Sequence, residues 1–400
     1  MKRSRGERGQ ALIFACVSIV TLFSCMAVAV DVGLLYGSKR AMQTAADAGA
    51  IAGALELNYK SPGYVTAART ATAQNGFTNG SGGTTVTVNS PPANGSFKGV
   101  SGYVEVIVSQ SQPTFFADAF GWKGVTVAAR SVADAVPSQF CVYLLGNVGG
   151  VRQTWGLLNS GLIDILDFPN CGIVDDAGIS NSGFLSINAS YVGVVGSVSG
   201  GPSITPAPVT IAPFTDPLSY LPQPSTAGCG AAKLLAGTQT VTNPTGKVCW
   251  DGLTFSPGAN ITFSPGLYII NGPVNLAGAG FISGTGVTFF FNNTFTFSGL
   301  TILTLSAPTT GTYNGILFFE SRADSNPVKI QGANLSILKG IIYLPNAALD
   351  ISDIISGIEL YDPLVVGQLT DTCLICFTVN FQNYNSVNAS NPLVQAKLAE

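Results

Sequence analysis

The sequence predicts a mainly β protein that begins with one long helix, continues into a small antiparallel sheet and ends in a parallel β-helix. Three observations support this fold class: an uncharged apolar run from Ala11 to Val30, alternating apolar and polar residues between 84 and 132, and short motifs that return every 21 or 22 residues beyond 137. A β-sandwich is the alternative for the last part, because it would also contain many short strands.

The apolar run has the length and the flanks of a transmembrane helix. About 20 residues at 1.5 Å each span roughly 30 Å, the thickness of the hydrocarbon core. Asp31 closes the run, and four basic residues precede it: Lys2, Arg3, Arg5 and Arg8. The positive-inside rule therefore predicts a cytoplasmic flank over 1–10, a transmembrane helix over 11–35 that meets lipid through Ala11–Leu35, and an extracytoplasmic remainder.

A cleaved secretory signal is the alternative interpretation of the same residues. Ala27-Val28-Ala29 has the small-x-small form of a signal peptidase site, and cleavage there would release a chain that starts at Val30. The apolar run is longer than the roughly 7 to 15 residues of a usual signal core, and helix-compatible sequence continues past the cut. We therefore expect a single-pass protein of the cell membrane.

Composition excludes several kinds of chemistry. The 400 residues contain no His, which removes the Ser-His-Asp and Cys-His nucleophile systems and the common zinc sites. Only 10% of residues are charged, and the formal net charge is −3. A mildly acidic ectodomain without a basic patch is a poor ligand for nucleic acid. We predict no catalytic residue, no cofactor and no metal site, and hence no enzyme.

The eight cysteines fall into two groups. Cys16 and Cys25 lie within the apolar run, as small apolar residues or lipid-facing thiols. The other six lie in the part predicted to be outside: Cys141, Cys171, Cys229, Cys249, Cys373 and Cys376. An even number in an oxidising compartment suggests disulfides, and proximity favours pairing the first with the second and the third with the fourth. The last two have the spacing of a redox motif without its strand-to-helix context, so we expect a structural bridge or two inert thiols.

A second helical piece follows the membrane segment, from Lys39 to about Asn58. It is dominated by Ala, the best helix former, and it lacks Pro. Ala45, Gly49 and Gly53 recur at every fourth position and make a smooth strip that permits close backbone approach. The strip packs either on this protein's own sheet or on similar helices of other subunits.

The residues up to 136 predict a small α+β module. A shorter helix is expected over about 64–75, and a short one over 115–120. Alternating, β-branched segments predict three strands: Thr84–Val88, Tyr103–Val108 and Val125–Val132. A long helix backed by a three-stranded antiparallel sheet is the outline of a pilin-like module, and we assign it to a neck over 36–136.

Within this region the chain resembles the N-terminal part of the TadE/TadG-like Flp pilus-assembly proteins. About 50 residues carry the resemblance strongly: Arg8-Gly9-Gln10-Ala11-Leu12, Ala29-Val30-Asp31-Val32-Gly33, Lys39-Arg40 and Gln43-Thr44-Ala45-Ala46-Asp47-Ala48-Gly49-Ala50. Tyr103–Val106 and Pro113–Ala117 extend it more weakly to about 135. The resemblance implies a bacterial membrane protein of the tight-adherence secretion and pilus machinery, with other Flp/Tad components or pilin subunits as partners and no catalytic residues.

One position departs from the pseudopilin members of that family. They carry a Glu five residues after the processing Gly, and counting from Gly9 this chain has Phe14 there. The departure favours an anchored, TadG-like protein over a processed pseudopilin.

Beyond Pro137 the chain becomes repetitive. The segment from Asn159 to Ile165 recurs 22 residues later at 181–187. Offsets of 21 relate Val274 to Phe295 and Val328 to Leu349, and an offset of 33 between those pairs indicates a coil with an inserted loop. Coils of this length predict a parallel β-helix over 137–400, with Gly286–Phe291 as a fully buried strand. The Pro-rich stretch at 202–224 is expected to be an excursion from the solenoid or a linker.

Two groups of residues in or near the solenoid suggest other functions. Clustered carboxylates could act on polysaccharides or bind calcium, although turn capping explains them equally well: Asp164, Asp167, Asp175 and Asp176. Surface aromatics could stack on sugars, although core packing is the commoner role: Trp122, Trp155 and Trp250.

The expected function is therefore that of a membrane-anchored structural or assembly protein of the Flp pilus and secretion system, acting in pilus biogenesis or surface adhesion, with cell-wall or surface glycans as a further candidate contact. The alternatives are a secreted β-helical, glycan-binding adhesin and a polysaccharide lyase or hydrolase.

Overall fold

The computed structural model describes residues 7–58, 63–160, 164–276, 278, 280–297, 301–331, 337–352, 359–360, 363–371, 376–380 and 393–400. The chain forms two compact units. Unit 1 contains the residues up to 136 together with 394–400, and unit 2 contains 137–393.

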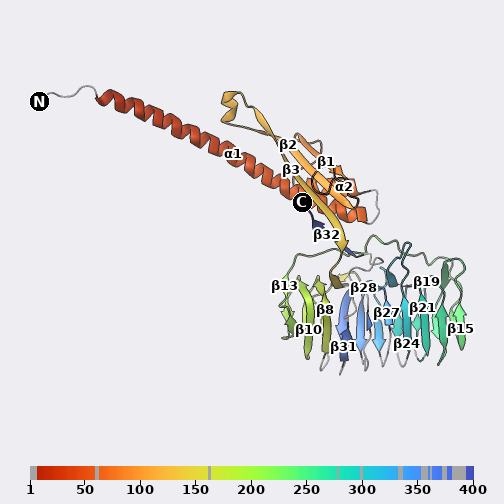
Figure 1. The fold of residues 1–400 in the computed structure, drawn as a ribbon. Helices are drawn as coiled ribbons and strands as arrows, with labels where there is room; N and C mark the ends of the chain where they lie inside the picture. Colours follow the sequence, from red (N-terminus) through yellow and green to blue (C-terminus); the bar gives the residue numbers. More distant parts are fainter. Residues whose placement is uncertain are drawn as a thin grey trace. The chain divides into compact units, whose positions relative to one another are not determined.

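Unit 1 combines two helices with a small sheet (Figure 1). The helices are α1 (Glu7–Asn58) and α2 (Tyr64–Gln74), with a short 3-10 helix, η1 (Ala117–Phe120). The strands are β1 (Thr84–Asn89), β2 (Tyr103–Pro113), β3 (Gly124–Pro137) and β32 (Val394–Leu398), hydrogen-bonded in that order. The expected helices and the three antiparallel strands are confirmed, and β32 adds a fourth strand from the C-terminal residues.

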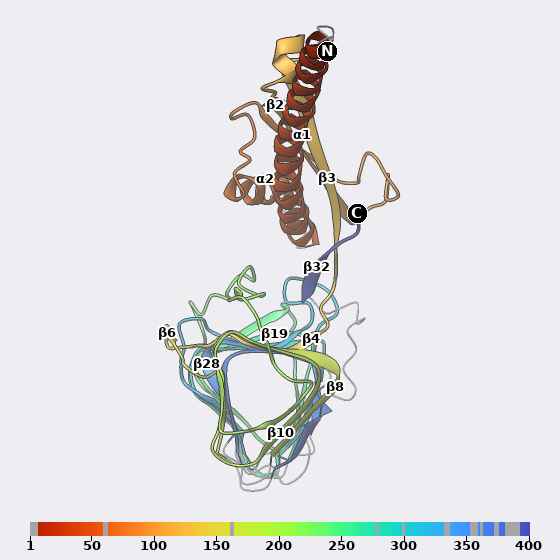
Figure 2. The same cartoon turned by 90° about the vertical axis from the view of Figure 1, so that its left-hand side faces the viewer.

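Unit 2 is a parallel β-helix, as the repeats predict, and its coils outline a three-sided tube when seen end-on (Figure 2). Successive strands of each coil contribute to three faces, which we call A, B and C. The long strands β8, β10, β28 and β30 turn a corner and contribute to two faces each.

Each face is a row of parallel strands. In spatial order, face A contains β14 (Lys233–Leu235), β17 (Leu253–Phe255), β20 (Val274–Asn275), β23 (Phe295–Phe297), β26 (Val328–Gln331), β28 (Ile341–Ser352), β30 (Leu364–Asp371), β7 (Leu157–Asn159), β9 (Ile179–Asn181) and β11 (Val198–Ser199). Face B contains β15 (Thr238–Val241), β18 (Asn260–Phe263), β21 (Phe281–Thr285), β24 (Ile302–Ser306), β27 (Ile337–Lys339), β29 (Glu359–Leu360), β31 (Cys376–Asn380), β8 (Asp164–Asp175), β10 (Leu185–Val194) and β12 (Ser203–Thr205). Face C contains β16 (Lys247–Trp250), β19 (Gly266–Ile270), β22 (Val287–Phe291), β25 (Ile316–Glu320), the first parts of β28 and β30, β4 (Phe140–Leu144), the second parts of β8 and β10, and β13 (Val209–Thr210). A hairpin of β5 (Asn147–Val148) and β6 (Val151–Arg152) lies between β4 and β7.

The predicted repeat register is largely correct. Val274 pairs with Phe295 and Val328 with Leu349, in both cases at an offset of 21. The 33-residue step is also present, where β23 pairs with β26. Asn159 pairs with Asn181 at the predicted offset of 22. Beyond 161–163, which lie outside the described residues, the offset falls to 21, so that the predicted alignment of 164–165 with 186–187 is one residue out of register.

The solenoid is built from two halves that meet in the middle. The chain starts unit 2 at β4 and coils outward to β13; it then runs along the outside to β14 at the opposite end and coils back. The returning strands β30 and β31 pair with β4, β7 and β8, so that Leu364 lies beside Val142 and Leu369 beside Leu157. Figure 1 shows this junction, where the blue β31 lies beside the green β8.

The inside of the solenoid is filled by stacked apolar side chains. Aromatic rings of neighbouring coils contact one another, with centroids 5.0 Å apart for Phe263 and Phe289 and 5.7 Å apart for Phe291 and Phe318. All five residues of β22 are buried, which confirms the predicted buried strand. Because each coil covers the apolar residues of the next, a chain with few charges can bury a large core.

Residues 211–229, which we call the strap, cross the outer side of face C. Leu218 and Leu221 of the strap are buried in one cluster with Phe290, Phe319 and Tyr343 of face C. Hydrogen bonds from residues in or beside face C fix the strap: Tyr343 Oη donates to Asp216 Oδ2 (2.5 Å), Arg322 Nη2 to Leu218 O (3.0 Å) and Tyr313 Oη to Pro222 O (2.9 Å). The predicted Pro-rich excursion thus divides into the strands β12 and β13 and most of the strap.

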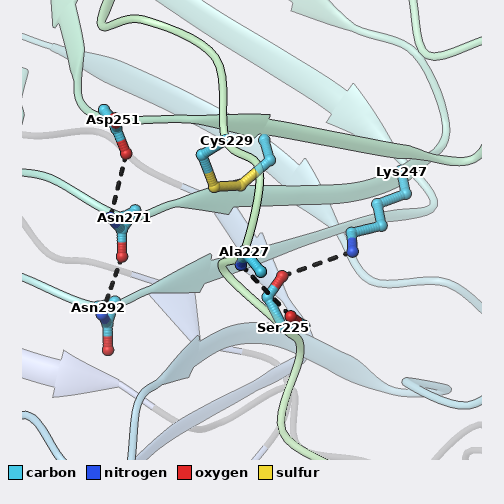
Figure 3. Close-up of a disulfide and its surroundings, with 8 residues drawn as sticks. Ser225, Ala227, Cys229, Lys247, Asp251, Asn271 and Asn292 are labelled. Carbon is cyan, nitrogen blue, oxygen red and sulfur yellow. Dashed lines mark hydrogen bonds between the residues drawn. A yellow bond between two sulfur atoms is a disulfide. The ribbon is translucent and has the colours of Figure 1, made fainter.

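Both favoured disulfides are present. Cys141–Cys171 links β4 to the corner of β8, and Cys229–Cys249 links the end of the strap to β16 (Figure 3). Lys247 Nζ also donates to Ser225 O (3.4 Å). Beside this disulfide, a ladder of side chains connects three coils at one turn, because Asn292 donates to Asn271 and Asn271 to Asp251, each at 3.0 Å. Cys373 lies outside the described residues, and only the backbone of Cys376 is described.

Glu320 is an exception to the apolar interior. It ends β25 opposite Phe291, its side chain is fully buried, and neither carboxylate oxygen has a hydrogen-bond partner among the described residues. Burial raises the pKa of Glu320 to about 9, and the nearby Asp324 carboxylate adds to the shift. Glu320 is therefore protonated in the folded state at neutral pH.

We predict that Glu320→Gln makes unit 2 less sensitive to alkaline pH. The folded state holds the Glu320 proton more tightly than the unfolded state, so its contribution to stability is full below pH 4.5 and is lost as the pH rises towards 9. Between those values the wild type should lose up to about 1.4 kcal/mol per pH unit relative to the variant. Thermal unfolding of both full-length chains at pH 5 and pH 8 measures this difference, and an equal difference at both values would contradict the assignment.

Candidate functional site: the anchor helix and the neck

The helix α1 is a single unbroken helix of 52 residues. The sequence predicts a membrane segment over 11–35 and a second helical piece from Lys39, and the structure joins them. The surroundings of the helix change near Met42. Side chains from Leu12 to Ala41 are mostly exposed, whereas Met42 and many of the residues after it are buried in unit 1.

The exposed half of α1 is also its apolar half. Leu12, Phe14 and Phe23 are 69%, 72% and 66% exposed, and no charged residue lies between Leu12 and Val30. Leaving such a surface in water would cost about 25 cal/mol for each Å². A helix satisfies its backbone hydrogen bonds internally, which is the requirement for entering lipid. Within the described residues α1 is long and apolar enough to cross a membrane, and it forms an apolar membrane anchor.

The buried half of α1 packs within unit 1 through the predicted strip of small residues. Ala45 is fully buried. A Cβ placed on Gly49 would lie 2.8 Å from Thr72 Cγ2 and 3.2 Å from Val106 Cγ1, and one on Gly53 would lie 2.9 Å from Val104 Cγ1. The strip therefore lets α2 and β2 approach the helix backbone, and this chain's own elements occupy it.

The other face of the sheet holds a network of ionic hydrogen bonds. Glu105 of β2 is fully buried and contacts Arg130 Nε (2.5 Å), Asn89 Nδ2 (2.7 Å) and the N–H of Ala93 (3.0 Å). Arg130 also contacts Glu400 Oε2 at 2.5 Å. This network ties β2, β3 and the residues after β32 together.

The pKa values of both carboxylates in this network are low. Burial alone would raise the pKa of Glu105, but hydrogen bonds from Arg130, Asn89 and Ala93 outweigh burial and lower it. Hydrogen bonds from Ser96 and Arg130 lower the pKa of Glu400 to about 2. Because the folded state favours the ionised carboxylates, their contribution to the stability of unit 1 is full above pH 4.5 and is lost in stronger acid.

Asp31 fixes the loop between β2 and β3 to α1. Its carboxylate accepts the backbone N–H groups of Phe115 (2.9 Å), Phe116 (3.0 Å) and Ala117 (2.8 Å), and Asp31 is only 7% exposed. The donors lie at the start of η1, where backbone N–H groups have no partner within the helix. Asp31 therefore both ends the apolar run and holds the loop against the helix.

The described carboxylates of the predicted acid/base group in unit 2 have structural partners. Asp175 is fully buried, its Oδ1 accepts the N–H of Ala177 (2.8 Å), and burial raises its pKa to about 7. Asp176 forms an ion pair with Arg152 (2.6 Å). Asp167 accepts a hydrogen bond from Asn188 (2.8 Å). The side chain of Asp164 lies outside the described residues. No group of three or more carboxylates or cysteines able to hold a metal occurs in the part of the chain that the structure describes.

The three tryptophans have different surroundings. Trp250 packs near Tyr268, with ring centroids 6.1 Å apart, and Trp155 is partly buried. Trp122 lies just before β3 and is 71% exposed. Of the three, Trp122 is thus the one whose ring is available to a partner.

Sequence reasoning missed the ionic network and the role of Asp31. Asp31 carries a recognisable signal, because it is the first charged residue after the apolar run. The partners of Glu105 and Arg130 carry no such signal, since Glu400 lies 270 residues from Arg130 along the chain.

We predict that Gly49→Leu destabilises unit 1 and that Gly37→Leu does not. A leucine at Gly49 would overlap Thr72 and Val106, whereas nothing lies within 4 Å of a Cβ on Gly37. Overpacking at Gly49 should cost about 3 kcal/mol, and Gly37→Leu should gain slightly in helix propensity. Hydrogen exchange of peptides from α2 and β2, measured on the full-length chain, reports the effect. Equal protection in both variants would show that the strip is not a packing surface.

Comparison with known proteins supports the interpretation of this region. No match was found among curated proteins or among solved structures. One family model does match, over the stretch that contains the anchor and the buried strip. Residues 9–56 match the family described as putative Flp pilus-assembly TadE/G-like, so this segment of the chain is similar to that family.

Proposed function

We propose that the protein is a single-pass structural component of the bacterial cell membrane that serves the assembly of Flp pili. The observation that carries the proposal is that the TadE/G-like match at 9–56 covers both the exposed apolar half of α1 and its buried half. The residues of the match thus combine a membrane anchor with the packing core of the neck.

The proposed orientation has the N-terminus in the cytoplasm and the residues after Asp31 outside. Four basic residues precede the apolar run, which favours this orientation. The two disulfides of unit 2 support it, because disulfides persist in oxidising compartments.

The proposed mechanism is mechanical and not catalytic. The described carboxylates of unit 2 that could suggest hydrolysis are buried or hydrogen-bonded within the fold. In this mechanism α1 fixes the protein in the membrane, and the solenoid offers a rigid surface to other Flp/Tad components, pilin subunits or surface glycans.

The proposed role predicts that loss of the protein reduces the number of surface pili. The neck variants then test whether pilus assembly needs the packing of unit 1. Deletion of the gene in the host bacterium should reduce the number of surface pili counted by electron microscopy. The wild-type chain and Gly37→Leu should restore them, whereas Gly49→Leu should fail because it disrupts the packing of α2 and β2 on α1. A deletion strain with a normal number of pili would contradict the proposed function.

A further inference from the structure

The loop between β2 and β3, residues 114–123, carries large apolar side chains that no protein covers. Phe115 is 67% exposed, Phe116 48% and Trp122 71%. Single exposed apolar residues are ordinary on a protein surface, but three aromatic rings within eight residues form an apolar patch of the kind that marks an interaction site.

The position of this loop along α1 indicates the partner. The loop and α1 enclose an open groove of about 920 Å³, whose helix wall extends from Val20 to Leu35. Val20 lies eleven residues before Asp31, a distance of about 16 Å along a helix. The rings of Phe116 and Trp122, which line the groove, therefore lie alongside the last turns of the apolar run. In Figure 1 the yellow loop extends beside α1, beyond the body of the sheet.

Backbone groups of the loop that lie near α1 have hydrogen-bond partners within unit 1, and the charged side chains of Asp118 and Lys123 are exposed. The backbone N–H groups of Phe115, Phe116 and Ala117 donate to Asp31. Within the loop, Trp122 N donates to Ala117 O (3.1 Å) and Thr114 Oγ1 donates to Trp122 O. Backbone groups that leave water must be satisfied internally. Lys123 is exposed next to Trp122, and the combination of an aromatic ring with a long basic side chain is typical of the headgroup region.

We propose that this loop enters the outer leaflet of the bilayer that α1 crosses, with its aromatic rings at the edge of the hydrocarbon and with Asp118 and Lys123 among the headgroups. The occupant of the groove is then lipid acyl chain, because its helix wall is continuous with the lipid-facing surface of α1. The inference rests on the proposed membrane anchoring. It adds a second contact that fixes the depth and the rotation of the helix, which a single smooth helix would leave free.

Fluorescence of Trp122 tests the inference. Trp155→Phe and Trp250→Phe, introduced together in the full-length chain, leave Trp122 as the sole tryptophan. The protein is reconstituted in vesicles of phosphatidylethanolamine and phosphatidylglycerol, with or without bromine on the acyl chains. We expect a blue-shifted emission that brominated lipid largely quenches and that aqueous acrylamide quenches poorly.

A matched control places the only tryptophan on unit 2. Phe184 is 77% exposed there, and Phe184→Trp combined with Trp122→Phe in the same background should respond to acrylamide and not to bromine. Emission of Trp122 that follows this control would overturn the inference, and so would a Trp122 shielded from both quenchers, which would indicate that a second copy of the chain covers the groove. Flotation of the vesicles separates the two proposals. A chain that does not float refutes the anchoring, whereas one that floats without bromine quenching refutes only the contact of the loop.

Discussion

The organisation of unit 1 depends on one constraint, which is that α1 is a continuous helix with two different surfaces. The side chains of its first half are mostly exposed Leu, Ile, Val and Phe, and its second half is lined by Ala and Gly and is enclosed by α2 and the sheet. Because the backbone hydrogen bonds run on without a break, the apolar segment and the core of the neck are parts of one continuous helix.

Unit 2 satisfies a different requirement, which is that its first and last residues lie close together in space. The solenoid grows outward from β4 and then inward from β14, so its last described coil pairs with its first. The N–H of Ser138 donates to Leu393 O (3.1 Å), which ties the first and the last residues of the unit together. A β-helix that coiled in one direction only would separate these ends by its whole length.

Carboxylates of the two units have pKa values that are shifted in opposite directions. In unit 1, Glu105 and Glu400 have lowered pKa values because Arg130 and neighbouring N–H groups stabilise their ionised forms. In unit 2, burial raises the pKa of Asp175 and of Glu320, so their neutral forms are favoured. Acid therefore removes the stability that ionised Glu105 and Glu400 contribute to unit 1, whereas it favours the protonated forms of Asp175 and Glu320 that the folded unit 2 prefers. The difference arises because Glu105 and Glu400 have hydrogen-bond donors as partners, whereas the Glu320 carboxylate has none among the described residues.

Patterns with a short period were readable from the sequence, and long-range pairings were not. Residues close together in the sequence define the apolar run, the strands of the neck and the 21-residue coils. The two disulfides likewise join cysteines that are near in sequence. The addition of β32 to the sheet and the pairing of β30 with β4 depend on contacts between residues more than 200 positions apart, which no local pattern encodes. Asp31 is an intermediate case, because its place at the end of the apolar run is visible in the sequence but its hydrogen-bond partners are not.

In the proposed orientation, the first half of α1 crosses the membrane and the residues after Asp31 lie on its outer side. The chain carries its own probes, because Cys16 and Cys25 are exposed on the apolar half. Spheroplasts would be treated with a membrane-impermeant maleimide, using a Gly37→Cys chain, and the labelled peptides identified by mass spectrometry. With this orientation, Cys16 and Cys25 react only after the membrane is dissolved and the chain denatured, whereas the cysteine at 37 reacts at once from the outside. Labelling of Cys16 or Cys25 in intact spheroplasts, or protection of the cysteine at 37, would contradict it.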